Sequence, residues 1–364
     1  MSSQSPHGRT EDRFSRRTML ETLGITTAGA VAMVQSTKAS ERRPAAADTS
    51  PAGCTVRVVA VSYSMPFHDH RQSGVNLEAL REKTAEVAKE HPNFVCYPEV
   101  CACIGGGFSK GIASAPELEP FVAEVGKIAR EFNTAMVVPF IERDGDKVYN
   151  SVPIVDRTGK LVLNYRKNYP TTGEMEEGIT PGHEVPVAEC DGVRVGATVC
   201  FDANFDHVAA ELERQRARLV FWPSMYWGGQ LLQHWALRYG FAVVVAYGAE
   251  SAIIDMNGQY LIQRGQDTLK VRQKLLPAWA AADVHVNREL FHLDFNQNKF
   301  PEMLAKYGRD IEIGLHEPEG YFLLASNRVD VPVEQIAAEF ELETNRDYLA
   351  RSVAMRNERL GKTV

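Results

Sequence analysis

The clearest pattern in the chain is an alternation of apolar residues with other residues between Val193 and Cys200. Val or Ala occupies every second position, which predicts a β-strand with one buried face. Asp206 suits a helix N-cap, and His207–Arg218 has the apolar spacing of a helix. We therefore expect the Cys200 thiol in the turn between a strand and a helix. The first N–H groups of a helix have no partner within it, so they are available beside such a thiol.

Strand-like and helix-like segments alternate along most of the chain, and this order is typical of an α/β fold. Helices are expected at Leu77–Val87, Leu118–Phe132 and Gly229–Tyr239. Pro98 and Pro223 are expected to end the strands that contain or precede them, because proline cannot donate a ladder hydrogen bond. Strands are expected at Val56–Ser62, Asn93–Glu99, Thr134–Ile141, Val148–Asp156, Leu161–Tyr165, Leu219–Trp222, Ala242–Tyr247, Ser251–Asp255, Tyr260–Arg264 and Ala281–Asp283.

Composition and charge exclude some classes of function. The chain has 364 residues, of which 44% are hydrophobic and 24% charged, as in an ordinary globular protein. Its formal net charge of −7, without a dense basic stripe, argues against a nucleic-acid partner. No apolar stretch reaches the ~20 residues that a membrane span needs.

The N-terminal segment is expected to lie outside the fold. Ser15–Leu20 contains Arg16 and Arg17 and precedes a mildly apolar run, Leu23–Val34. Together they resemble a twin-arginine export signal. The resemblance implies recognition by the twin-arginine export machinery and a periplasmic location, with anchoring in the membrane if the signal is not cleaved. The alternative is a disordered basic tail that contains two adjacent arginines.

Three chemically distinct side chains each end a predicted strand. Glu99 follows Pro98, Lys167 follows the strand Leu161–Tyr165, and Cys200 follows the alternating strand. In α/β folds, ligands collect at the carboxyl ends of strands. A carboxylate, a fixed cation and a thiol provide a base, an oxyanion stabiliser and a nucleophile, which is the set that acyl transfer requires.

The residues around these three side chains resemble a known family. Tyr97-Pro98-Glu99, Tyr165-Arg166-Lys167 and Cys200-Phe201-Asp202 are similar to the motif blocks of the nitrilase (carbon–nitrogen hydrolase) superfamily. The resemblance covers about Val56–Arg288. Four supporting blocks occur in the family's order: Tyr149-Asn150-Ser151, Pro181-Gly182, Trp222-Pro223-Ser224 and Ile253-Ile254-Asp255-Met256-Asn257-Gly258.

The resemblance implies a four-layer α-β-β-α sandwich, assembly into homodimers or higher homo-oligomers, and no cofactor or metal. It also implies a second glutamate shortly after the lysine. Glu174 fits that position, with Glu176 and Glu177 as alternatives. The expected organisation is a signal region at 1–39, a linker at 40–54, a carbon–nitrogen hydrolase domain at 55–290 and a mostly helical C-terminal extension at 291–364.

The chemistry expected from this set is hydrolysis of a non-peptide C–N bond. Glu99 accepts the thiol proton, Cys200 attacks the carbonyl carbon, and Lys167 with the backbone N–H of Phe201 stabilises the oxyanion. Glu99 then protonates the departing amine, and water hydrolyses the thioester. Glu174 is expected to position Lys167 and the substrate.

A small amide is the expected substrate, with an N-carbamoyl compound as the alternative. Nitrile-specific members of the superfamily usually carry Trp-Glu after the cysteine, where this chain has Phe201-Asp202. No arginine directly follows the Cys200 block to bind a substrate carboxylate, although Arg238 would do so if its helix faces the site. The candidate substrate-binding residues are Phe201, Asn204, Phe205, Tyr226 and Trp227.

Two other classes of function compete with this interpretation. His68, Asp69 and His70 would suit a metal hydrolase if further ligands lay nearby. A non-catalytic binding protein that kept the fold is the second alternative, although all three catalytic side-chain types are retained.

Overall fold

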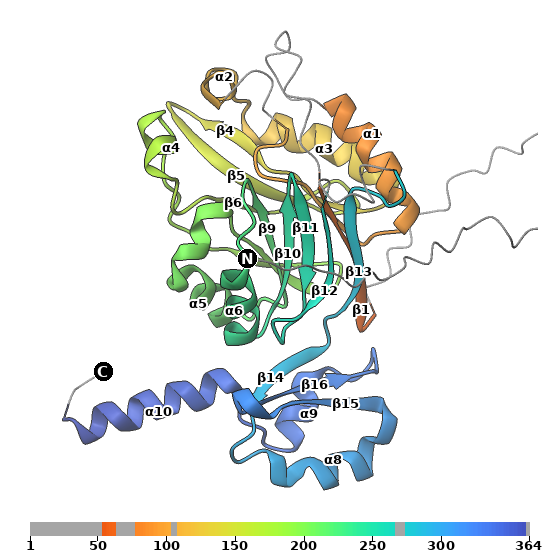
Figure 1. Ribbon diagram of the computed structural model, residues 1–364, viewed down its shortest axis with the longest axis vertical. Coiled ribbons are helices and arrows are strands. Elements are labelled where there is room, and N and C mark those ends of the chain that lie inside the picture. Colours follow the sequence, from red (N-terminus) through yellow and green to blue (C-terminus); the bar gives the residue numbers. More distant parts are fainter. Residues whose placement is uncertain (1–52, 63–76, 103–107, 266–273, 362–364) are drawn as a thin grey trace, which may run out of the picture. The chain divides into compact units, whose positions relative to one another are not determined.

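The computed structural model describes residues 53–62, 77–102, 108–265 and 274–361 (Figure 1). The expected signal region, nearly all of the linker, and His68, Asp69 and His70 lie outside these residues. None of the helices in the described ranges combines the length and the hydropathy that crossing a membrane requires.

The first sheet has the strand order β13-β1-β2-β3-β5-β4, with β6 paired to β5. β1, β2 and β3 are parallel, so their carboxyl ends share one edge of the sheet. The strands are β1 (Thr55–Val61), β2 (Phe94–Cys96), β3 (Ala135–Val137), β4 (Phe140–Asp144), β5 (Lys147–Val155), β6 (Leu161–Arg166) and β13 (Trp279–His285).

The second sheet has the strand order β12-β11-β10-β9-β8-β7, in which β8, β9 and β10 are parallel. Its strands are β7 (Val187–Cys190), β8 (Val193–Ala197), β9 (Leu219–Ser224), β10 (Ala242–Tyr247), β11 (Glu250–Ile254) and β12 (Tyr260–Gly265).

The helices of this domain are α1 (Leu77–Val87), α2 (Phe108–Ala113), α3 (Leu118–Phe132), α4 (Thr172–Glu176), α5 (Asp206–Arg214) and α6 (Gln230–Tyr239).

Successive side chains of β1 point to opposite faces of the first sheet, and this shows how the layers stack. Val58 and Ala60 pack in one core with the second sheet and with residues of α5 and α6. Val59 and Val61 pack in another core with residues of α1 and α3. The described part of the chain therefore forms helix, sheet, sheet and helix layers (Figure 1), as the resemblance implies.

Two sequence expectations about element ends are corrected. β9 continues through Pro223, which pairs with Ala246, although Pro223 was expected to end it. The Phe221 carbonyl faces β8, because it accepts from Thr198 N. Pro223 is two residues further along the strand, so its nitrogen faces the same side. The pairing with β8 has already ended there. The missing N–H therefore costs no ladder bond.

The helix after the cysteine turn also differs from its expectation. α5 includes Asp206 as its first residue instead of using it as a cap, and Asp206 Oδ1 accepts from Trp235 Nε1 at 3.2 Å. The helix ends at Arg214 instead of Arg218, because Arg216 adopts a φ of 59°, in the left-handed region.

The C-terminal extension is not built of helices alone. Its helices are α8 (Phe300–Tyr307), α9 (Val333–Glu339) and α10 (Asn345–Arg359). An antiparallel sheet that the sequence did not predict accompanies them: β14 (Arg288–His292), β16 (Tyr321–Ser326) and β15 (Ile311–His316). Phe291, Phe322 and Ile336 belong to a core that these elements form among themselves. Since the strands are short, their pairing depends on that non-local packing, which a local pattern does not reveal.

Candidate active site

The two sheets bring together the three side chains that the sequence placed at strand ends. Glu99 follows β2 and Lys167 directly follows β6, both in the first sheet, whereas Cys200 opens a 3-10 turn after β8 in the second sheet. All three are buried: Lys167 is 1% exposed, Glu99 6% and Cys200 8%. A thiol and two charged groups are thus held in a site with little solvent.

Lys167 lies between two carboxylates. Its Nζ is 2.9 Å from Glu99 Oε1, and 3.0 and 2.8 Å from the two oxygens of Glu174. A capping box at the start of α4 fixes Glu174: Thr171 N donates to Glu174 Oε2, and Glu174 N donates to the Thr171 hydroxyl. Glu176 and Glu177, the sequence alternatives, are exposed.

Asn150 is a member of the site that the sequence analysis did not assign. Its Nδ2 donates to Glu99 Oε1 at 2.8 Å and to Glu174 Oε1 at 2.9 Å. The backbone carbonyl of Asn150 accepts from Lys167 N at 2.8 Å, because β5 and β6 are antiparallel neighbours. The available signal was the Tyr149-Asn150-Ser151 block in the strand that pairs with the one leading to Lys167.

The electrostatics keep Lys167 and Glu174 charged. Burial lowers the pKa of Lys167, but the charges of Glu99 and Glu174 and the hydrogen bond to Glu174 outweigh it and raise the pKa above its usual range. Burial raises the pKa of Glu174, but the charge and hydrogen bonds of Lys167 have the larger combined effect, so the pKa is lowered. Lys167 is therefore a fixed cation at neutral pH and not a proton acceptor.

The Cys200 thiol is protonated in the resting site. Burial, and then the charge of Glu99, raise its pKa to about 12, although Lys167 and hydrogen bonds from Met225 and Ser224 act in the opposite direction. Its backbone has a φ of 48°, which strains a residue with a Cβ. Strain of this kind persists only where the surrounding structure holds it.

Glu99 has one oxygen in use and one unused. Its Oε1 accepts from Lys167 and Asn150. Its Oε2 is buried and has no hydrogen-bond partner among the described residues. A buried oxygen without a partner is costly, so its presence beside a thiol points to a proton acceptor.

The candidate substrate-binding residues divide into two groups. The Tyr226 hydroxyl donates to the Cys200 carbonyl at 3.2 Å, and Asn204 Nδ2 donates to the Phe201 carbonyl at 2.9 Å, so both brace the cysteine turn. The Phe201 and Phe205 rings form an edge contact, with centroids 5.7 Å apart, and Phe205 stacks on Tyr169.

Trp227 and Arg238 have neighbours of their own. Trp227 stacks on Tyr260, with 6.0 Å between ring centroids. The guanidinium of Arg238 lies 6.0 Å from the Tyr239 ring centroid, and its charge acts on Glu213. These are the interactions that the structure gives Arg238, and they provide no support for a carboxylate clamp at Cys200.

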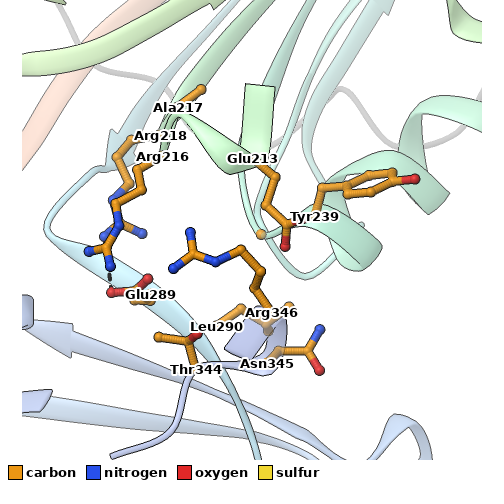
Figure 2. A pocket seen from close by; sticks show the side chains of 11 residues that line it. Glu213, Arg216, Ala217, Arg218, Tyr239, Glu289, Leu290, Thr344, Asn345 and Arg346 are labelled. Carbon is orange, nitrogen blue, oxygen red and sulfur yellow. Dashed lines mark hydrogen bonds and ion pairs between the residues drawn. The ribbon is translucent and has the colours of Figure 1, made fainter. Parts of the chain in front are cut away.

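A cavity of about 30 Å³ lies where α5 and α6 meet the C-terminal extension (Figure 2). Arg218 forms an ion pair with Glu289 at its wall. No member of the Glu99–Lys167–Cys200 set lines it, so it is a feature of the junction and not of the catalytic centre. Within the described ranges, no group of three or more His, Cys, Asp or Glu side chains is placed to hold a metal ion.

Comparison with known families identifies the domain. The family model described as "Carbon-nitrogen hydrolase" matches residues 65–278. The chain belongs to this family. The expected membership of the nitrilase superfamily is therefore confirmed.

Similar curated proteins include a citrullinase from Francisella tularensis, 25% identical over 180 residues, which are 46% of this chain and 61% of that protein. An N-carbamoylputrescine amidase from Arabidopsis thaliana is 28% identical over 109 residues, covering 29% and 36% of the two chains. The chain spans about half the length of the curated relatives it matches.

Solved structures share the fold. An amidase from Nesterenkonia has a TM-score of 0.54 at 19% identity, covering 69% of this chain and 96% of that one. A nitrilase-superfamily member from Saccharomyces cerevisiae has a TM-score of 0.55 at 18% identity, covering 64% and 90%. The expected α/β fold of the nitrilase type is confirmed.

Proposed function

We propose that this carbon–nitrogen hydrolase cleaves a small amide to an acid and ammonia through a thioester on Cys200. The observation that supports this most is the buried group of Lys167 between Glu99 and Glu174, with Glu99 Oε2 unused. Such a site holds a permanent cation for an oxyanion and a free basic oxygen for a proton.

The first step forms the thioester. Because the pKa of Cys200 is raised to about 12, little thiolate exists at neutral pH. Glu99 therefore takes the thiol proton as sulfur attacks the carbonyl carbon, and the C–O π electrons move onto oxygen. Lys167 and the N–H of Phe201 stabilise that oxyanion. When it collapses, the C–N bond breaks and Glu99 gives its proton to the nitrogen, which leaves as ammonia.

The second step regenerates the enzyme. Glu99 is again a carboxylate and takes a proton from water as the water oxygen attacks the thioester carbon. The tetrahedral intermediate expels sulfur, Glu99 returns the proton to it, and the acid departs. Glu174 is proposed to hold Lys167 in place through both steps, since its two oxygens lie 3.0 and 2.8 Å from Nζ.

N-carbamoyl compounds are the second candidate substrates. The name of one relative, N-carbamoylputrescine amidase, favours them, whereas the name deaminated glutathione amidase of another favours amides. Phe201-Asp202 after the nucleophile argues against nitriles as preferred substrates. Phe201, Asn204, Phe205, Tyr226 and Trp227 are proposed as substrate contacts. A non-catalytic binding role is the remaining alternative.

The test is a product assay on purified protein with matched amides, N-carbamoyl compounds and nitriles. Ammonia alone supports the amidase proposal, and ammonia with carbon dioxide supports the carbamoyl alternative. Faster turnover of nitriles than of matched amides contradicts both. Cys200→Ala should abolish turnover, and intact-protein mass spectrometry should detect an acyl adduct on the wild-type chain only.

Two proposals concern the whole protein. We propose export through the twin-arginine machinery to the periplasm, on the pattern at Ser15–Leu20. We also propose assembly into a homodimer or higher homo-oligomer, on the resemblance to the superfamily. Sedimentation of the purified protein tests the second, and a monomer at micromolar concentration would contradict it.

A further inference from the structure

Asp202 lies two residues after the proposed nucleophile and is fully buried, at 0% exposure. Its carboxylate accepts hydrogen bonds from two separate parts of the chain. We infer that Asp202 is a positioning residue that holds the Cys200 turn against the segment carrying Lys167. The inference rests on the proposed function, because it assigns Asp202 a task in the same reaction.

The first set of bonds shapes the turn of the cysteine. Asp202 Oδ2 accepts from Val199 N at 2.9 Å and from the Thr198 hydroxyl at 3.3 Å. Asp202 N donates in turn to the Val199 carbonyl at 2.9 Å. The two residues enclosed by these bonds are Cys200 and Phe201, and Cys200 has a left-handed φ of 48°. These contacts help to hold a backbone conformation that Cys200 would otherwise leave.

The second set of bonds reaches the segment of the lysine on both sides. The Tyr165 hydroxyl donates to Asp202 Oδ2 at 2.7 Å, and Tyr169 N donates to Asp202 Oδ1 at 2.8 Å. Tyr165 lies two residues before Lys167 and Tyr169 two residues after it. One carboxylate thus connects the end of β6 in the first sheet with the turn after β8 in the second.

The arrangement requires an ionised carboxylate that only accepts. Burial raises the pKa of Asp202 to about 6, opposed by hydrogen bonds from Tyr165, Val199 and Tyr169 and by the charge of Lys167. At neutral pH the group is therefore charged. The sulfur comes from the second sheet, whereas the cation and the base both come from the first. A small shift between the sheets therefore reduces the rate sharply; a displacement of about 1 Å can cost ~10²-fold.

Asp202→Asn tests the inference. An asparagine cannot satisfy this site in either orientation, because its NH₂ group faces either the N–H of Tyr169 or the donors on Oδ2. We expect kcat for an amide to fall by about 10²-fold, while KM stays close to its wild-type value. We also expect the pKa of the thiol, measured by iodoacetamide alkylation against pH, to move from about 12 toward its ordinary 9, as Cys200 leaves its buried place beside Glu99.

Asp156→Asn is the matched control. Asp156 also receives several donors in a turn, but Thr158 N, the Thr158 hydroxyl and Lys160 N all bind its Oδ1, which an asparagine retains. This variant should keep both the kcat and the alkylation profile of the wild type. A purely structural role for Asp202 would lower the melting temperature without moving the thiol pKa, and that result would overturn the inference.

Tyr165→Phe provides a second variant if Asp202→Asn fails to fold. It removes the bond from the Tyr165 hydroxyl to Oδ2 and a longer one, at 3.3 Å, that the hydroxyl accepts from Asn168 N, but keeps the bond from Tyr169 N to Oδ1. The same shift of the thiol pKa is therefore expected at smaller size, and an unchanged profile with unchanged kcat overturns the inference. If the wild type turns over no C–N substrate, the proposed function fails. The alkylation profiles of the two variants then decide the positioning role by themselves.

Discussion

Cys200 keeps its proton in the resting site because burial, and then the charge of Glu99, raise the pKa of its thiol to about 12. The same Glu99 has a buried oxygen without a partner in the described part of the chain. The charge of Glu99 thus keeps the population of free thiolate low, and its Oε2 is available to accept the thiol proton. In the proposed mechanism the nucleophile forms only as a substrate carbon accepts the sulfur, and a thiol that keeps its proton is protected from oxidation or alkylation between turnovers.

Glu99→Gln should separate reactivity from catalysis. Removal of the negative charge lowers the pKa of Cys200, because that charge is one of the causes that raise it. We expect faster alkylation by iodoacetamide at pH 9 than in the wild type, together with loss of amide turnover. Glu176→Gln, at an exposed position on the nearby helix α4, should change neither quantity. Slower alkylation in Glu99→Gln would contradict the electrostatic account.

Asn150→Asp should reduce kcat and alter its pH dependence. The variant places a carboxylate at hydrogen-bond distance from Glu99 Oε1 and Glu174 Oε1, which Asn150 now bridges. Like charges raise the pKa of neighbouring carboxyl groups, so the acid limb of the rate profile should move to higher pH. A loss of about tenfold in kcat corresponds to ~1.4 kcal/mol in the barrier.

The control for Asn150→Asp is Asn257→Asp. Asn257 Oδ1 accepts from Gln259 N in an exposed turn, and an aspartate keeps that bond. An acid limb that stays in place in Asn150→Asp, relative to wild type and control, would refute the bridging role.

Export is tested at Arg16 and Arg17. If the twin-arginine machinery recognises Ser15–Leu20, replacement of both arginines by lysine should leave the protein in the cytoplasm. Cell fractionation followed by an immunoblot measures this, with Arg9→Lys and Arg13→Lys together as the matched control. Unchanged export of the Arg16 and Arg17 variant means that another signal acts.

Glu213, beside the cavity of Figure 2, should make stability depend on pH. Burial raises its pKa from 4.5 to about 7, although Arg346 and Arg238 lower it. The folded state therefore disfavours the charged form of Glu213. Glu213 does not reduce the stability well below pH 4.5, and it reduces the stability fully above pH 7. Glu213→Gln should raise the melting temperature at pH 8 by about 2 °C, with little effect at pH 4.5.

Glu211→Gln is the control for that change, at a position two residues before Glu213 in the same helix, α5. A hydrogen bond from Arg214 lowers the pKa of Glu211, which is the opposite direction. Its replacement should therefore not raise the melting temperature at pH 8. If Glu213→Gln has the melting temperature of the wild type at every pH, Glu213 does not cause the pH dependence of stability.

The local sequence pattern predicted the strands and the positions of the site residues at the strand ends. Glu99, Lys167 and Cys200 each follow a run whose periodicity predicts a strand, and the parallel pairing of β1 with β2 and of β8 with β9 follows from their crossover helices. The blocks around them identified the family and hence the stacking of the layers. The substrate contacts stay predictions, since Tyr226 and Asn204 brace the cysteine turn.

The roles of Asn150 and Asp202 depended on contacts between distant residues. Asn150 meets Glu99 across 51 positions, and Asp202 meets Tyr165 across 37. Neither contact follows from the period of a strand or helix, because each depends on register between neighbours or on the distance between sheets. The sheet of the extension was missed for the same reason: β14 and β16 are separated by a helix and by β15.

The pairing of β1 with β13 has a mechanical consequence. Thr55, at the start of β1, lies opposite His285, at the end of β13, and Val286 N donates to the Cys54 carbonyl at 2.8 Å. The chain therefore enters and leaves the hydrolase domain at the same end of one antiparallel ladder. A pull between the N-terminal segment and the C-terminal extension would load its hydrogen bonds one after another, as a zipper is opened, and not all together in shear. Force applied through these two tethers would open the domain from this edge of the first sheet, and the pair β1 and β13 would separate first.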